Sequence, residues 1–100
     1  MAAAEDIAKR FGENLKRCRR LVDLSQEQAG LRASLHRTEI GLLEHGRRVA
    51  RIDTLLKLMA ALEADARELL DGITWVPGDL RVGQFAFASA LGGKAAGRRL

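Results

Sequence analysis

Side chains that bind phosphates and base edges are concentrated in one stretch of this sequence. Residues 16–51 hold nine of the 17 Lys and Arg residues but only four of the 13 Asp and Glu residues. A guanidinium group presents a planar fork of N–H donors that fits guanine O6 and N7 as well as phosphate oxygens. A basic segment therefore suits a polyanion such as a nucleic acid. The alternative interpretation of the same charges is a solvated protein face.

Other chemistries lack the residues that they need. His36 and His45 are the only histidines and Cys18 is the only cysteine, so the sequence offers no metal-ligand cluster and no internal disulfide. The sequence shows no nucleophile with a base and an orienting group, and no glycine-rich phosphate loop. We therefore expect a protein that is not an enzyme and needs no cofactor. Cys18 lies at helical spacing from Leu15 and Leu21, which favours a small core residue over a redox sensor.

Length and composition limit the chain to one small domain. It has 100 residues, of which 47% are apolar and 30% charged, and a domain of this size buries roughly 60 to 65% of its unfolded surface. Self-association is therefore favoured. The opening MAAAEDIAKR has charges and no apolar signal core, and no stretch has the roughly 20 apolar residues of a membrane helix. We expect a cytoplasmic protein with no membrane partner.

Two helices are predicted in the first third of the chain. Ser25, with Gln28 three residues later, has the pattern of an N-cap with a capping box, and the helix that it starts should run to about Ala33. The preceding segment, residues 5–22, has apolar side chains at steps of three and four and is an amphipathic helix. Its apolar face carries Ile7, Phe11, Leu15 and Cys18.

Three further helices complete the predicted bundle. Helical spacing returns at residues 36–44, which turn Ile40 and Leu43 inward, and Gly46 is expected to close this helix. Asp53 is the expected N-cap of a fourth helix, and Asp65 that of a short fifth helix that stops near residue 72. The fourth helix carries Leu55, Leu58, Met59 and Leu62 on one side.

The last quarter of the chain does not continue the helical spacing of the five predicted helices. The predicted fold class is therefore all-α, with a short extended or β C-terminal arm. We expect a helical domain over residues 5–74, an arm over residues 75–91 and a flexible basic tail over residues 92–100. Phe85 and Phe87 would share one face of a strand. The arm and the end of the bundle supply the candidate residues for dimerisation, which are Leu69, Leu70, Ile73, Trp75, Phe85 and Phe87.

The segment LSQEQAGLRASLHRTEIGLLEHGRR, residues 24–48, resembles the helix-turn-helix signature of the Cro and phage-repressor type, the XRE family of bacterial transcriptional regulators. The segment IDTLLKLMAALEADARELL, residues 52–70, resembles the closing helices of the same domain. The resemblance covers about residues 8–74. It implies a five-helix, repressor-type DNA-binding domain that binds a two-fold operator in double-stranded DNA as a homodimer, with the helix at residues 36–44 in the major groove.

The resemblance also implies roles for individual residues. Arg19 and Glu44 align with a structural ion pair. Gln26 aligns with a glutamine that bonds a phosphate at the start of the second helix. The residues implied to contact bases are His36, Arg37, Thr38 and Leu42, and Arg37 is the best base reader among them. Those implied to contact the DNA backbone are Gln26, His45, Arg47, Arg48 and Arg51.

Three positions depart from the family pattern or stay open. Ser34 replaces the turn glycine in a left-handed conformation that costs other residues about 1 to 2 kcal/mol, so we expect a distorted turn. Glu39 either accepts from cytosine N4, repels phosphate, or pairs with Arg32 or Arg37. Gly41 allows close approach either to DNA or to a neighbouring helix.

Several functions remain compatible with the sequence. Within the DNA-binding class, a restriction-modification controller and a prophage repressor are not separated. The rival from another class is an antitoxin or adaptor that mainly holds a partner protein, such as a toxin, through the C-terminal arm. The exposed apolar arm favours the rival, and the basic loop after residue 44 favours DNA.

Overall fold

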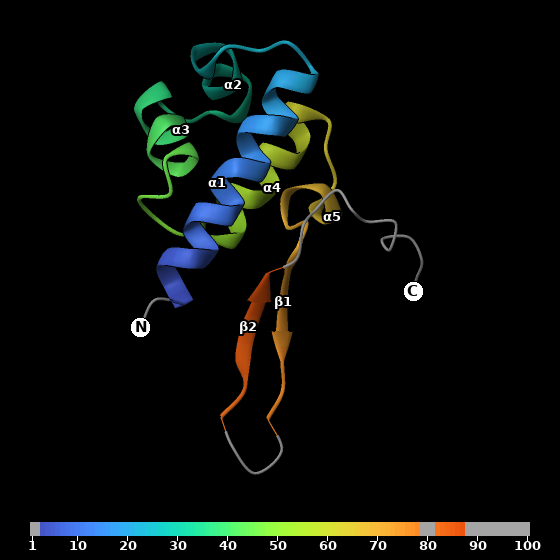
Figure 1. Cartoon of the computed structure of the whole chain (residues 1–100). Helices are drawn as coiled ribbons and strands as arrows, with labels where there is room; N and C mark the ends of the chain where they lie inside the picture. The colour runs from blue at the N-terminus through green and yellow to red at the C-terminus, as the bar shows by residue number, and fades with distance from the viewer. Residues whose placement is uncertain (1–2, 79–81, 88–100) are drawn as a thin grey trace.

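The described part of the chain forms a bundle of five helices from which a β-hairpin projects, as Figure 1 shows for the computed structural model. The structure describes residues 3–78 and 82–87, so the predicted basic tail and the end of the arm lie outside the described residues. The predicted fold class is confirmed. The elements are α1 (Ala3–Leu21), α2 (Gln26–Ala33), α3 (Arg37–Glu44), α4 (Ile52–Leu62), α5 (Ala66–Leu69), β1 (Ile73–Val76) and β2 (Gln84–Phe87).

Two capping boxes begin the helices α2 and α5 where the sequence predicts helix starts. Ser25 Oγ accepts from the Gln28 backbone N–H at 3.0 Å, and Gln28 Oε1 accepts from the Ser25 N–H at 2.8 Å. Asp65 and Glu68 make the same reciprocal pair at α5. Each box satisfies N–H groups that have no partner inside the helix.

The predicted cap of α4 is wrong. The helix begins at Ile52, and its N-cap is Arg51, which makes no side-chain capping bond. Asp53 lies in the first turn instead, where its Oδ1 accepts from the Thr54 N–H at 2.9 Å. A carboxylate there still interacts favourably with the helix dipole, so the same residue type suits either position.

The core is formed by buried side chains from α1, α2, α3, α4 and α5. Phe11, Leu15 and Cys18 of α1 face it as predicted, whereas Leu21 is 71% exposed because α1 ends there. Burial raises the pKa of the Cys18 thiol, which suits a core residue and not a reactive thiolate. The buried partners from the other helices include Ile40, Leu43, Leu58, Leu62 and Leu69.

Asn14 is a buried polar residue that the apolar pattern of α1 does not reveal. It is 1% exposed, and its Nδ2 donates to the carbonyls of Leu69 at 2.9 Å and Asp71 at 3.0 Å. Its Oδ1 accepts from Arg17 Nη1 at 3.1 Å. Asn14 therefore fastens α1 to the segment from which the hairpin leaves the bundle.

Two glycines allow helix backbones to touch. A Cβ atom on Gly30 would lie 2.5 Å from the carbonyl oxygen of Leu35, and one on Gly12 would lie 2.4 Å from that of Leu43. Neither backbone atom can move aside cheaply. Gly30 thus allows α2 to approach the turn before α3, and Gly12 allows α1 to approach the C-terminal end of α3.

The turn between α2 and α3 is not distorted, contrary to expectation. Ser34 itself adopts the left-handed conformation, with φ 56° and ψ 42°. The Leu35 N–H then donates to the Gly30 carbonyl at 2.8 Å, which closes the C-terminus of α2. The strain of about 1 to 2 kcal/mol is offset by the packing of α2 against α3.

The hairpin presents one aromatic face. β1 and β2 pair antiparallel, with Ile73 opposite Phe87 and Trp75 opposite Phe85, so these four side chains share a face. Ile73 packs against the core, and Phe87 is half-buried. Trp75 and Phe85 form an edge-to-face pair with ring centroids 5.0 Å apart and remain 51% and 37% exposed.

The candidate dimerisation set therefore needs a correction. Leu69 is fully buried, so it cannot reach a partner subunit, and its helical spacing reflects the bundle core. Ile73 and Phe87 lie on the half of the hairpin nearest the bundle. Of the six candidates, Leu70, Trp75 and Phe85 are exposed.

Candidate nucleic-acid interface

The N-terminus of α3 is capped by one of the predicted DNA-contacting residues. The Nδ1 atom of His36 accepts from the Thr38 backbone N–H at 3.0 Å. Because this bond occupies Nδ1, the remaining ring atom, Nε2, is the donor that His36 can offer to a ligand. The side chains of Arg37 and Thr38 are exposed in the first turn of α3, directly after this cap.

A single surface hollow between α2 and α3 gathers six of the nine residues predicted to contact DNA. It is lined by Gln26, Arg37, Thr38, Gly41, Leu42, His45 and Arg47. Side chains at positions 38, 42 and 45 lie on one side of a helix, which explains why α3 presents them together. The other three predicted contacts, His36, Arg48 and Arg51, are exposed outside this lining.

Gly41 faces this hollow and not a packed helix. A Cβ atom at Gly41 would have a single neighbour within 4 Å, the Gln26 Oε1 atom at 3.7 Å. That is ordinary van der Waals contact, so packing within the protein does not require a glycine. Of the two interpretations of Gly41, close approach to a ligand therefore has the stronger support.

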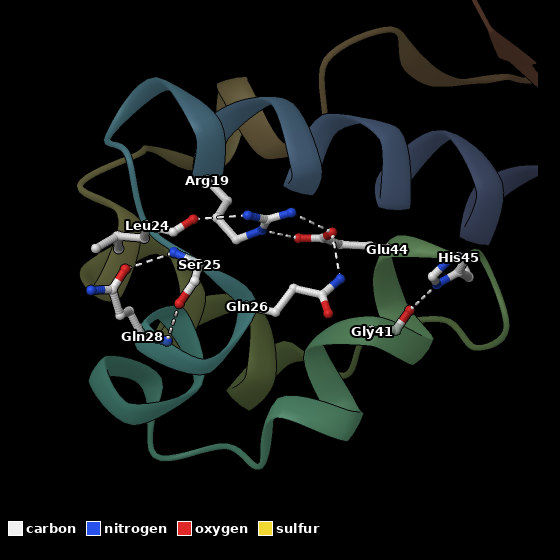
Figure 2. Close-up of polar contacts among 8 residues, drawn as sticks. All are labelled: Arg19, Leu24, Ser25, Gln26, Gln28, Gly41, Glu44 and His45. Carbon is white, nitrogen blue, oxygen red and sulfur yellow. Dashed lines mark hydrogen bonds and ion pairs between the residues drawn. The ribbon is translucent and has the colours of Figure 1, made fainter.

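The expected ion pair between Arg19 and Glu44 is present and nearly buried. Arg19 Nε donates to Glu44 Oε2, and Arg19 Nη2 donates to Glu44 Oε1 at 3.0 Å. The side chains are 11% and 2% exposed. Arg19 Nη1 also donates to the Leu24 carbonyl at 2.8 Å, and the bonds to the carboxylate raise the pKa of the Arg19 guanidinium. Figure 2 shows this pair joining α1 to the end of α3.

Glu44 also holds Gln26, which the sequence does not reveal. Gln26 Nε2 donates to Glu44 Oε1 at 3.0 Å (Figure 2). An amide nitrogen has two N–H donors, so one remains for a phosphate oxygen at the start of α2. One carboxylate therefore fixes the α1–α3 contact and orients the amide at the edge of the hollow.

The basic residues of the site differ in their intramolecular partners. Arg37 lies 3.8 Å from Glu27 with both side chains about two-thirds exposed, which is a weak pair. Arg51 pairs with Asp53 at 3.2 Å. Within residues 3–78 and 82–87, Arg47 has no ion-pair partner. At the end of α3, the His45 Nδ1 atom lies 2.8 Å from the Gly41 carbonyl.

Glu39 has a partner that differs from both expected ones. Its Oε1 accepts from Arg48 Nη1 at 2.9 Å, whereas Arg32 pairs with Glu63 at 3.5 Å. Of the three alternatives that the sequence left open for Glu39, an ion pair with Arg32 or Arg37 is therefore not the one that the structure shows. Arg48 lies in the loop after α3 and folds back toward the first turn of that helix, a contact that helical spacing does not predict.

An exposed apolar patch on α4 is also missing from the predicted sites. Ile52 and Leu56, one helical turn apart, are 74% and 58% exposed, and Val49 just before α4 is 49% exposed.

In the part of the chain that the structure describes, no group of three or more His, Cys, Asp or Glu residues is placed to hold a metal ion. No helix among the same residues is long and apolar enough to cross a membrane.

Known proteins match this chain over its helical bundle. The sequence model of a family described as a helix-turn-helix domain matches residues 10–71. Control protein C.SmaI of Serratia marcescens is 38% identical over 65 residues, which cover 65% of this chain and 77% of that protein. The crystal structure of the restriction-modification controller protein C.AhdI from Aeromonas hydrophila has a TM-score of 0.60 at 35% identity, covering 62% of this chain and 94% of that one.

A third relative is a hypothetical transcription factor, NHTF, from Neisseria. Its crystal structure has a TM-score of 0.61 at 28% identity and covers 65% of this chain and 75% of that chain. The family match ends at residue 71, before β1 begins. The hairpin is thus an addition to the matched region.

Proposed function

This chain belongs to the XRE family of helix-turn-helix transcriptional regulators, and we propose that it binds a two-fold operator in double-stranded DNA as a homodimer, with α3 in the major groove. The observation that carries the proposal is the hollow between α2 and α3. Six residues expected to contact DNA line this hollow together, and Gly41 places no side chain in it.

The proposed contacts divide into two chemical groups. Arg37, Thr38 and Leu42 reach base edges, with His36 beside them, and the Arg37 fork binds guanine O6 and N7. The backbone contacts come from Gln26, His45, Arg47, Arg48 and Arg51, which supply affinity without sequence information. The names of C.SmaI, a control protein, and C.AhdI, a restriction-modification controller, favour control of restriction-modification genes as the context.

Affinity selection from a random duplex pool tests the proposal. We expect the bound fraction at about 150 mM salt, near physiological ionic strength, to contain a two-fold motif. Its half-sites should lie about 34 to 36 Å apart, one helical turn of DNA. Flat enrichment, together with binding at low salt, would show that α3 does not read sequence and would shift attention to a protein partner.

The homodimer contact is proposed on the exposed part of the hairpin face. An isolated two-stranded hairpin is marginally stable in water, and Trp75 and Phe85 leave aromatic surface uncovered. We expect Phe85→Lys to convert the dimer to a monomer in sedimentation. The matched control is Thr74→Lys on the opposite face of β1, which should leave the dimer intact.

A second lysine variant distinguishes a dimer interface on the hairpin from one on α4. Leu56→Lys alters the exposed patch of α4 without touching the hairpin. If this variant dissociates the dimer and Phe85→Lys does not, the interface lies on α4. If the wild type is a monomer that captures a partner protein through Trp75 and Phe85, the adaptor function replaces the homodimer.

A further inference from the structure

Arg48, proposed to bind a DNA phosphate, already has an anionic partner within the protein. Its Nη1 donates to Glu39 Oε1 at 2.9 Å. The Glu39 side chain is 26% exposed and that of Arg48 is 51% exposed, so the pair is partly shielded but remains accessible. A carboxylate and a phosphate are both acceptors for the same guanidinium donors.

Glu39 lies on α3 between the side that faces the core and the side that lines the hollow. Ile40 and Leu43 of α3 point into the core, and Thr38, Leu42 and His45 line the hollow. Glu39 belongs to neither set, because its position is about 100° around the helix from that of Thr38. Its carboxylate is directed to Arg48 and not to the hollow where base edges would lie.

We propose that Glu39 is an internal competitor for phosphate at Arg48, which sets how tightly the protein binds any duplex. The inference rests on the proposed DNA-binding function. To contact a phosphate, Arg48 exchanges the Glu39 carboxylate for a phosphate oxygen. The released carboxylate then stands near the negatively charged backbone. The cost of this exchange does not depend on base sequence, so Glu39 lowers affinity without reading a base.

The test is Glu39→Gln, compared with the wild type on the selected operator and on a random duplex. Glutamine keeps the side-chain length but removes the charge. We expect both duplexes to bind tighter, by a similar factor of about threefold per subunit, from the range measured for exposed ion pairs. The slope of log K against log salt should stay close to that of the wild type, because Arg48 neutralises one phosphate in both proteins. The selected motif should be unchanged.

Two matched variants separate this exchange from a general effect of charge. Glu63→Gln removes the same charge from an exposed pair with Arg32, outside the hollow, and should leave affinity and salt slope close to the wild type. In an Arg48→Ala background, Glu39→Gln should lose most of its effect. If Glu63→Gln strengthens binding as much as Glu39→Gln, net charge explains the result and the proposal is wrong.

A change in sequence preference would also overturn the proposal. Weaker operator binding by Glu39→Gln, with a motif altered at one position, would make Glu39 a base reader that accepts from cytosine N4. Failure of the proposed function itself is a separate outcome, because then the wild type would select no motif at all.

Discussion

Glu44→Ala should lower the free energy of unfolding by about 3 to 5 kcal/mol, the usual cost of breaking a buried ion pair from one side. The Arg19 side chain is 11% exposed in the intact pair, and among the described residues the substitution leaves its guanidinium with only the Leu24 carbonyl as a partner. It also releases the Gln26 amide from its acceptor. Urea denaturation measures the stability. Operator affinity should fall further than the loss of folded protein accounts for, because Gln26 is no longer oriented toward phosphate.

Two variants test the physical reason for this loss. Replacing both partners, Arg19→Leu with Glu44→Leu, should cost less stability than Glu44→Ala alone, because no charge is then left buried without a partner. Glu44→Gln keeps an oxygen that accepts from Gln26 and should retain more DNA binding at equal folded fraction. If the double variant is as unstable as the single one, the pair contributes packing and not charge compensation.

Arg37→Ala should reduce the discrimination between operator and mismatched duplexes by about 1 to 3 kcal/mol per half-site. Arg37 begins α3 and lines the hollow, and its one ion pair with the described residues is the 3.8 Å pair with the exposed Glu27. A bidentate contact to guanine can therefore replace that pair at little cost. Competition binding against operators changed at single positions measures the effect, and preference should relax at one base pair in each half-site.

Arg47→Ala is the matched control for this experiment. Arg47 lines the same hollow but is proposed to contact phosphate, so its loss should weaken all duplexes alike and lower the salt slope by about one unit per subunit. Arg37→Lys keeps the charge but not the planar fork, and should behave like Arg37→Ala in discrimination. Equal effects of Arg37→Ala on operator and random DNA would contradict its role as a base reader.

The sequence by itself determined the five helices of this protein and their order, but not the pairing of Ile73–Val76 with Gln84–Phe87 in a hairpin. Capping boxes at Ser25 and Asp65 act over three residues, and apolar spacing acts over one or two helical turns, so both can be recognised without the fold. The wrong prediction of the α4 cap also has a local cause, because an aspartate such as Asp53 is suitable both as an N-cap and in the first turn of a helix. Resemblance to a family then supplied the pairing of Arg19 with Glu44, which spacing alone does not predict.

Only the tertiary structure decided which side chains meet. Periodicity identifies an apolar face but not what covers it, and so Leu69 proved to be core while Trp75 stayed exposed. The bond from Asn14 to α5, the contact of Glu39 with Arg48 and the sharing of Glu44 by Arg19 and Gln26 each join separate elements. Such contacts depend on how helices cross, which is set by the packing of the whole core and by close backbone approaches such as that at Gly30.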